Sequence, residues 1–268
     1  ALADGKPVVV QTKPEHGFKL TANQLRWAIT PRTKWVMLNS PCNPTGAAYT
    51  EDELRALTDV LLDYPHVWIF TDDIYAKLAY DGFVAKTIVQ VEPRLRDRTV
   101  TMNGVSKAYA MTGWRIGFSA APVSLTKQLV KLQGQSTSNP CSIAQAAALA
   151  AVSGPQDFIA EMVSVYQERR NLVVSMLNEA PGLSCHTPEG AFYVFPSMQG
   201  TLGKTSRGGA RIDSDEAFVT ALLEETGVAA VHGAAFLTPG YFRVSYATST
   251  ELLREACARI QSFCKGLS

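Results

Sequence analysis

The sequence has no long apolar run, almost no net charge and no signal-like beginning. No run approaches the roughly 18 apolar residues that a membrane-spanning helix needs, and the first residues lack the charged-then-apolar order of a signal peptide. The net charge of +1 provides no broad basic surface for nucleic acid or anionic membranes. We therefore expect a cytoplasmic protein that binds neither nucleic acid nor membranes.

Cysteine and histidine are too scattered to suggest a metal. The 5 cysteines are odd in number and form no Cys-x-x-Cys pair, so neither a disulfide framework nor a zinc site is expected. The 4 histidines also lack the spacing of metal ligands. With 46% hydrophobic and 18% charged residues, the 268-residue chain has the composition of an ordinary globular protein, long enough for about two domains.

Strand-like and helix-like segments alternate in the first half, which predicts an α/β fold with a mainly parallel sheet covered by helices. Two helix starts have the spacing of a capping box, Thr21 with Gln24 and Thr50 with Glu53. The expected strands are residues 7–11, 35–39, 67–72, 99–103 and 115–120.

The second half predicts one long helix and a smaller α+β domain. An amphipathic helix is expected over residues 156–179, and it connects a large domain, residues 1–165, to a small C-terminal domain, residues 166–268. Strands of the small domain are expected at residues 192–195, 228–231 and 241–246. The stripe of the last helix that is expected to face the core consists of Leu252, Ala256, Ile260 and Phe263.

Residues 104–117 carry the pattern of a cofactor-binding lysine. The sequence Gly-Val-Ser-Lys-Ala-Tyr-Ala-Met-Thr-Gly-Trp-Arg-Ile-Gly places Lys107 in a turn of small residues, 8 positions before Arg115. A lysine amine forms Schiff bases with carbonyls when its surroundings favour the uncharged form, and a neighbouring cation has that effect. The planar fork of an arginine also suits a phosphate. A surface lysine after a strand is the alternative for an isolated Ser-Lys pair.

Three further motifs support the lysine site. An Asn-Pro-Thr-Gly loop carrying Asn43 follows one apolar run, and a second run ends on Asp72, with the phenol of Tyr75 three residues later. Near the C-terminus, an alternating strand carries Arg243 among apolar neighbours. Asn43, Asp72 and Lys107 each follow the carboxyl end of an expected strand, where open α/β sheets bind their ligands.

Together these motifs resemble the fold-type I pyridoxal-phosphate enzymes, and within them the class I/II aminotransferases related to bacterial aspartate aminotransferase. The lysine segment matches throughout, including Gly113 and Gly117, and the other motifs fall in the family's order. The resemblance implies a three-layer large domain, a smaller α+β C-terminal domain and a homodimer. It also implies pyridoxal 5′-phosphate as cofactor.

The resemblance implies catalytic roles for Lys107, Asp72 and Tyr75. Lys107 would bind the cofactor and later move the proton at the substrate's α-carbon. Asp72 would keep the ring nitrogen protonated, and Tyr75 would hydrogen-bond the ring's phenolic oxygen together with Asn43. The alternatives are a strand-end turn or helix cap for Asp72 and a core aromatic for Tyr75.

The remaining roles concern binding. Ser106 and Arg115 would bind the cofactor phosphate, whereas Arg243, with Asn43, would bind the α-carboxylate of the substrate. A structural salt bridge is the alternative for Arg243. Gly104 stands where some members of the family have a serine, which puts one phosphate contact in doubt.

The expected function is transfer of the amino group of an L-amino acid, aspartate first, to 2-oxoglutarate. The alternatives are another α-amino-acid transaminase or a β-lyase of the same fold, a regulator that only senses the cofactor, and an inactive fragment or scaffold. In the family, a phosphate-cupping loop and two active-site aromatics would precede Ala1. The 268 residues alone are therefore expected not to be a competent transaminase.

Overall fold

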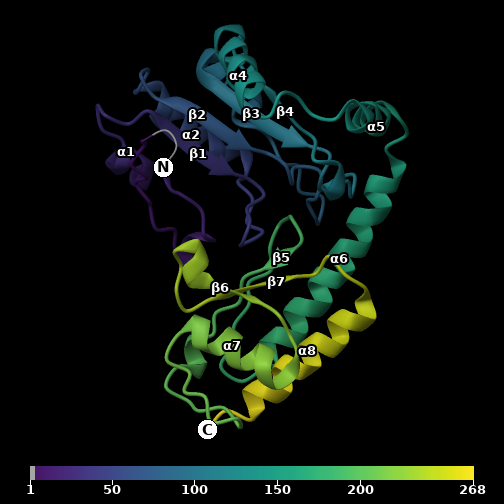
Figure 1. Ribbon diagram of the computed structural model, residues 1–268. Helices are drawn as coiled ribbons and strands as arrows, with labels where there is room; N and C mark the ends of the chain where they lie inside the picture. The colour runs from purple at the N-terminus through teal and green to yellow at the C-terminus, as the bar shows by residue number, and fades with distance from the viewer. Residues whose placement is uncertain (1–3) are drawn as a thin grey trace. The chain divides into compact units, whose positions relative to one another are not determined.

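The computed structural model describes residues 4–268, which form two compact units (Figure 1). The first unit comprises the residues up to 41 together with 47–79 and 84–159; the second comprises residues 42–46, 80–83 and 160–268. Helix α6 (Asp157–Asn178) begins in the first unit and continues through the second. The sequence predicted a single boundary, between residues 165 and 166, that separates a large from a small domain. That boundary stays a prediction.

The first unit is built on a four-stranded sheet in the order β1-β2-β3-β4. β1 pairs with β2, and β2 with β3, in parallel, whereas β4 runs antiparallel to β3 (Figure 1). This arrangement confirms the predicted α/β class with a mainly parallel sheet. The strands are β1 (Trp35–Asn39), β2 (Trp68–Asp72), β3 (Thr99–Gly104) and β4 (Gly117–Ala120).

Two strand predictions for this unit need correction. Residues 7–11 form no strand, and the side chains of Val8 and Val9 are 72% and 52% exposed, because β-propensity alone does not provide a neighbouring strand to pair with. The strand expected over residues 115–120 begins only at Gly117, since Arg115 has left-handed backbone (φ 56°) that cannot continue a strand.

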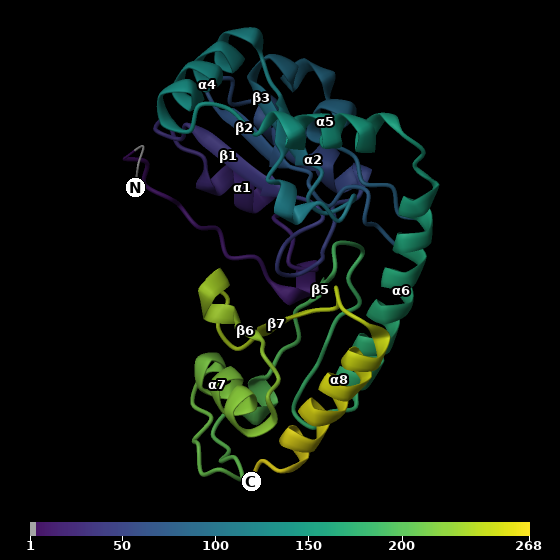
Figure 2. The ribbon, with the colours of Figure 1, turned by 45° about the vertical axis from the view of Figure 1, so that its right-hand side comes forward.

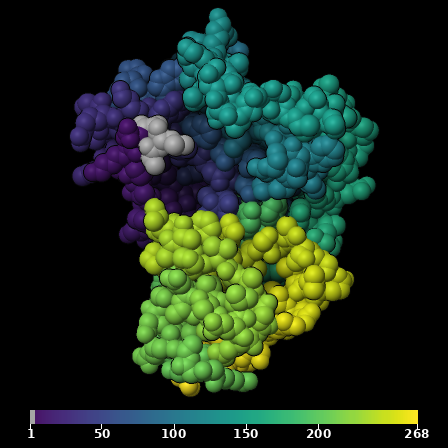
Figure 3. Space-filling model, in the orientation of Figure 1, coloured from purple at the N-terminus to yellow at the C-terminus, as the bar shows by residue number. Residues whose placement is uncertain are grey.

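Helices cover the sheet, and both predicted capping boxes are present, at the starts of α1 and α2. α2 buries Leu54, Leu57 and Leu61 in the same core as Ile69 of β2. By contrast α4 has no buried residue, and it lies at the top of the space-filling view (Figure 3). The helices of this unit are α1 (Ala22–Ala28), α2 (Glu51–Leu62), α3 (Ile88–Val91), α4 (Val123–Ser136) and α5 (Ser142–Ser153), with 3₁₀ turns at Pro14–His16, Pro93–Arg98 and Thr112–Trp114.

The second unit packs a small antiparallel sheet, in the order β5-β7-β6, with α7, α8 and the rest of α6. α6 and α8 lie side by side in both ribbon views (Figures 1 and 2), and Leu177 and Ile260 from these helices share a core with Phe242 of β7. The elements are β5 (Tyr193–Val194), β6 (Val231–His232), β7 (Phe242–Ser245), α7 (Asp215–Thr226) and α8 (Thr250–Lys265), with 3₁₀ turns at Gln199–Thr201 and Gly233–Phe236. Of the strand expected over residues 228–231, only Val231 belongs to β6.

The buried stripe of α8 includes Ile260 and Phe263 as predicted, with Ala256 partly buried against the same core, and it differs from the prediction at Leu252. Leu252 is 55% exposed, and its neighbour Leu253 is only 2% exposed. The sequence periodicity fits both positions, and the face that packs was decided by contact with the rest of the core. The buried residues of the helix are Leu253, Cys257, Ile260, Phe263 and Cys264.

We expect Ile260→Ala to lower the free energy of unfolding by about 2–5 kcal/mol, because the side chain is fully buried and its removal leaves a cavity. Leu252→Ala in the same helix is the control and should cost less than about 1 kcal/mol, since that side chain already meets solvent. Urea unfolding of the two variants measures both values. Equal losses would mean that the two side chains do not differ in burial.

Candidate active site

The segment between β3 and β4 forms a tight loop around Lys107. Val105 and Ile116 anchor its two ends in a small core with Ala144 of α5, and the amide of Val105 donates to the carbonyl of Ile116 at 3.4 Å. Ala110 (φ 51°) and Arg115 (φ 56°) have left-handed backbone, which is uncommon for residues other than glycine and concentrates at functional sites. The anchored ends fix the place of Lys107 in the loop.

Asp72, Tyr75 and Lys107 come together at the carboxyl end of β2. Nζ of Lys107 lies 5.8 Å from the centroid of the Tyr75 ring, and its charge acts on Asp72. Burial raises the pKa of the Asp72 carboxyl, against the opposing effects of the Ile74 amide, which donates to Oδ1 at 3.2 Å, and of Lys107. A carboxylate that is destabilised in this way gains from any further cation placed beside it.

Two consecutive carboxylates end β2, and they have different surroundings. Asp73 is buried, accepts a hydrogen bond from the Thr71 hydroxyl, and has a pKa raised by burial. Asp72 is only half-buried, and its carbonyl accepts from Nδ2 of Asn39 on the paired strand at 2.9 Å. Asp73 is thus engaged inside the fold, whereas Asp72 is half-buried and lies within reach of the charge of Lys107.

The two residues predicted to bind phosphate are linked through Thr112. Nη1 of the exposed Arg115 donates to the Thr112 carbonyl at 3.0 Å, and the Thr112 hydroxyl donates to the Ser106 carbonyl at 3.0 Å. The glycine at position 104 has a packing reason, since a Cβ there would lie 3.0 Å from the carbonyl oxygen of Ile116. The close approach of β3 and β4 therefore disfavours a serine at this position.

Asn43 and Arg243 belong to the second unit, where they contact one another. Nη1 of Arg243 donates to Oδ1 of Asn43 at 2.7 Å. The Arg243 guanidinium also lies over two aromatic rings, with Cζ at 4.7 Å from the centroid of Tyr193 and 5.0 Å from that of Phe236. No carboxylate among residues 4–268 pairs with Arg243, so the alternative of a structural salt bridge is not observed. The guanidinium keeps further N–H groups for a ligand.

Tyr193 and Phe236 are functional candidates that the sequence did not single out. Their rings contact the guanidinium of Arg243, which also donates to Asn43. Aromatic rings placed in this way stabilise a cation. An aromatic residue in the expected strand 192–195 was the available signal, but the pattern alone does not reveal which arginine it contacts. The other predicted residues, Asp72, Tyr75, Ser106, Lys107 and Arg115, all lie in the first unit.

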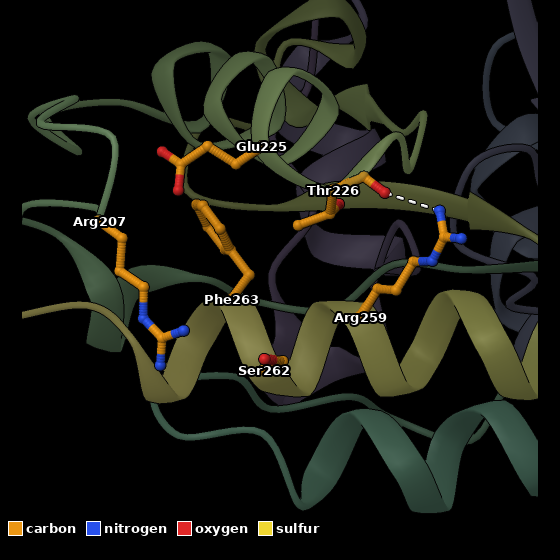
Figure 4. Close-up of a pocket in the computed structure, with 6 residues that line it drawn as sticks. All are labelled: Arg207, Glu225, Thr226, Arg259, Ser262 and Phe263. Atoms are coloured by element: carbon orange, nitrogen blue, oxygen red, sulfur yellow. Dashed lines mark hydrogen bonds between the residues drawn. The ribbon is translucent and has the colours of Figure 1, made fainter.

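A separate pocket of the second unit contains none of the predicted catalytic or binding residues (Figure 4). Phe263 lies between Arg207 and Arg259, and Arg259 donates to the carbonyl of Thr226 at 2.8 Å and to the carboxylate of Glu255. The lining residues are Arg207, Glu225, Thr226, Arg259, Ser262 and Phe263. Arg259 is therefore already bonded to its own helix and to the end of α7, and the pocket carries no group assigned to the proposed chemistry.

Two features are absent from the described residues 4–268. None of the helices formed by these residues is long and apolar enough to cross a membrane. No group of three or more His, Cys, Asp or Glu residues in this range could hold a metal ion.

Residues 1–260 match the family model for aminotransferase class I and II. The chain belongs to the class I and II aminotransferases. It is 63% identical to the aspartate/prephenate aminotransferase of Cereibacter sphaeroides over 267 residues, which are 100% of this chain and 67% of that protein. It is 52% identical to the aspartate aminotransferase of Rhizobium meliloti, covering 100% of this chain and 65% of that protein. The family predicted from the lysine, Asn-Pro-Thr-Gly and Asp-x-x-Tyr motifs is confirmed.

Solved aminotransferase structures have the same fold. The crystal structure of the Rhizobium meliloti aspartate aminotransferase superimposes with a TM-score of 0.96 at 52% identity, over 100% of this chain and 67% of that one. The aromatic aminotransferase of Pyrococcus horikoshii gives 0.90 at 37% identity, over 98% of this chain and 68% of that one. The predicted fold type I is confirmed by these neighbours. The chain spans about two thirds of the length of the relatives that it matches.

Proposed function

We propose that the protein is a pyridoxal-phosphate-dependent aminotransferase that moves the amino group of aspartate to 2-oxoglutarate. The arrangement of Lys107 beside Asp72 and Tyr75, in a chain of this family, carries the proposal. The names of the most similar relatives support aspartate as donor. Prephenate is the second candidate acceptor, because the 63% identical relative is named for it. A homodimer is part of the same proposal.

The residues of the first unit suit this cofactor. Asp72 is a carboxylate whose pKa is raised by burial, so that a protonated ring nitrogen beside it would compensate the cost of its charge. Ser106 and Arg115 are linked through Thr112 and supply a hydroxyl and a planar cation for the phosphate. Lys107 supplies the amine that attaches the cofactor covalently.

When bound, pyridoxal phosphate supplies an electron sink for the negative charge that develops at the substrate's α-carbon. Lys107 would hold the cofactor through Nζ, and its amine would move the proton at the substrate's α-carbon as general base and acid. Asp72 would keep the ring nitrogen protonated, and the Tyr75 hydroxyl of the same unit would orient the phenolic oxygen of the ring. Each of these groups acts on charge that grows in the transition state.

Arg243 and Asn43 bind the α-carboxylate of the substrate. A guanidinium donates two parallel N–H bonds to a carboxylate, and only one Arg243 nitrogen is engaged by Asn43. The rings of Tyr193 and Phe236 lie beside the guanidinium and stabilise its charge through cation–π contacts. All four residues belong to the second unit.

In a form that spans the full length of its relatives, of which these 268 residues cover about two thirds, we expect the protein to transfer the amino group of aspartate to 2-oxoglutarate. In that form Arg243→Leu should lower kcat/KM by about 10²-fold, mostly through KM, because a substrate carboxylate loses its cation. Steady-state assays against a panel of amino acids, with and without prephenate as acceptor, measure both. Arg211→Leu, an exposed arginine paired with Asp213, is the control and should leave the kinetics unchanged. Absence of transfer from every amino acid would contradict the proposed function, and an unchanged kcat/KM in Arg243→Leu would assign that arginine to the fold.

A further inference from the structure

Arg170 of α6 is a buried arginine that has no donor left for a ligand. It is 2% exposed, and its Nη1 donates to Oδ2 of Asp81 at 2.6 Å and to the carbonyl of Pro188 at 3.0 Å. Nη2 donates to Oδ1 of Asp81 at 3.1 Å and to Oδ1 of Asn171 at 2.7 Å, and Nε donates to the same Asn171 oxygen at 3.0 Å. A guanidinium has five N–H donors, so the geometry uses all of them within the protein.

Asp81 is presented to Arg170 by a tight turn. Asp81 (φ 57°) and Gly82 (φ 75°) are both left-handed, and the amide of Phe83 donates to the carbonyl of Tyr80 at 2.9 Å, as in two-residue hairpin turns. The bond to Arg170 holds the pKa of the Asp81 carboxyl below its usual range. The Tyr80 ring lies under the guanidinium, 5.0 Å from Cζ to centroid. The turn and the arginine thus form one rigid block.

This block holds the segment 188–191. Arg170 binds the carbonyl of Pro188, and the amide of Tyr80 donates to the carbonyl of Glu189 at 3.0 Å. The Tyr80 hydroxyl donates to the carbonyl of Ala191, a fully buried residue with left-handed backbone (φ 59°). A non-glycine residue keeps that conformation only where its surroundings impose it. Three carbonyls in a run of four residues are therefore fixed by Arg170 and Tyr80.

The segment contacts the loop that carries Asn43. The amide of Gly190 donates to the carbonyl of Gly46 at 2.9 Å, and the amide of Gly46 donates to the carbonyl of Cys42 at 2.8 Å, which closes the loop around Asn43. The approach is so close that a Cβ on Gly46 would lie 2.5 Å from Cβ of Pro188. The position of Asn43 therefore depends on where the segment 188–191 is held.

The same segment leads into β5 and its contact with Arg243. Two residues after Ala191, the ring of Tyr193 lies 4.7 Å from the Arg243 guanidinium, and Tyr193 pairs with Ser245 across the sheet. The segment thus contacts the Asn43–Arg243 pair from two sides, through the loop of Asn43 and through Tyr193. All of these residues belong to the second unit.

We infer that Arg170, with Asp81, is a positioning residue for substrate binding: it holds the segment 188–191 where it sets Asn43 and Tyr193 against Arg243. The inference rests on the proposed function, because it takes Arg243 to bind the substrate's α-carboxylate. Since Lys107, Asp72 and Tyr75 lie in the other unit, loss of Arg170 acts on carboxylate affinity and not on proton transfer. If the Arg243 guanidinium is displaced, it no longer donates two parallel hydrogen bonds to the substrate carboxylate, and the affinity for the substrate falls.

Two conservative variants test the inference in the holoenzyme. Arg170→Lys keeps the charge and loses the fork, and Asp81→Asn keeps a side chain that tolerates left-handed backbone. Each should weaken binding of succinate, a dicarboxylate without an amino group to transfer, by about 10-fold in calorimetry. KM for aspartate should rise by the same factor with kcat within about 2-fold, and amide hydrogen exchange at Gly190 should accelerate. Arg169→Met is the control, since Arg169 contacts Thr250 and Tyr166 instead, and should change none of these.

Unchanged succinate affinity and KM in both variants would overturn the inference, whether or not the melting temperature falls, because Arg170 would then serve stability alone. An about 10-fold loss in kcat with KM unchanged would also overturn the inference, since positioning of the carboxylate acts on substrate binding. Failure of the proposed function has a different signature. In that case the wild-type holoenzyme does not bind succinate, or Arg243→Leu binds it as well as wild type, and the inference falls with it.

Discussion

Lys107→Ala should lower the rate of transamination by about 10⁴-fold or more, the largest effect expected for any single residue of this chain. The substitution removes both the covalent attachment of the cofactor and the base that moves the proton at the α-carbon. Steady-state assays measure the rate, and borohydride reduction of the holoprotein followed by peptide mapping identifies the labelled lysine. In the wild type the pyridoxyl group should be found on Lys107, whereas the variant should bind the cofactor without covalent attachment.

Two further variants separate chemistry from charge. Lys107→Arg keeps a cation near Asp72 and Tyr75 but never becomes a neutral amine, so it should be as inactive as the alanine variant. Lys77→Ala removes a lysine of the same unit that donates to the Tyr109 hydroxyl at 2.8 Å, and it should retain activity. A pyridoxyl label on a lysine other than 107, or substantial turnover by Lys107→Arg, would refute the assignment.

Asp72→Asn should slow proton abstraction by about 10²–10³-fold with the fold intact, because a neutral amide of the same shape does not keep the ring nitrogen protonated. Single-turnover absorbance of the holoenzyme with aspartate measures this step. Asp63→Asn is the control, since Asp63 is an exposed residue that pairs with Arg26, and it should leave the rate unchanged. A normal single-turnover rate in Asp72→Asn would mean that Asp72 acts as a strand-end cap only.

The pH dependence of the Asp72 variant provides a second measurement. Burial raises the pKa of the Asp72 carboxyl in the chain without cofactor, and a protonated ring nitrogen beside it would lower that pKa again. In the wild-type holoenzyme the carboxylate becomes protonated, and activity is lost, as the pH falls through the pKa of this pair. In Asp72→Asn this acidic limb should be absent while the low rate persists. If activity fell at acidic pH in the same way in both proteins, that fall would belong to the titration of another group.

The motifs gave correct local predictions where neighbouring residues decide the outcome. The capping boxes at Thr21 and Thr50 formed as expected, because both partners are three residues apart and need nothing from the rest of the chain. The strand 35–39 was predicted to the residue, since an apolar run that ends in a proline-rich loop leaves little choice.

Predictions failed where a distant partner had to be present. Residues 7–11 have high β-propensity but no neighbouring strand, and they stay unpaired. In α8 the periodicity allowed Leu252 or Leu253 to face inward, and packing against the rest of the core selected Leu253. A local pattern records what a segment is able to do, and the contacts made by the folded chain select among these possibilities.

The sequence by itself determined the family, the mainly parallel sheet and the candidate residues from Asn43 to Arg243, because motif spacing and apolar periodicity are properties of short segments. Only the tertiary structure decided that Asp73 is buried, with hydrogen bonds from Thr71 and from the distant Thr87, while Asp72 stays half-buried beside Lys107. It also brought Asn43 to Arg243, 200 positions away along the chain, and held that pair through Arg170. Such contacts form only when the whole core packs. Core packing is the sum of many weak contacts between distant residues, which no single motif determines.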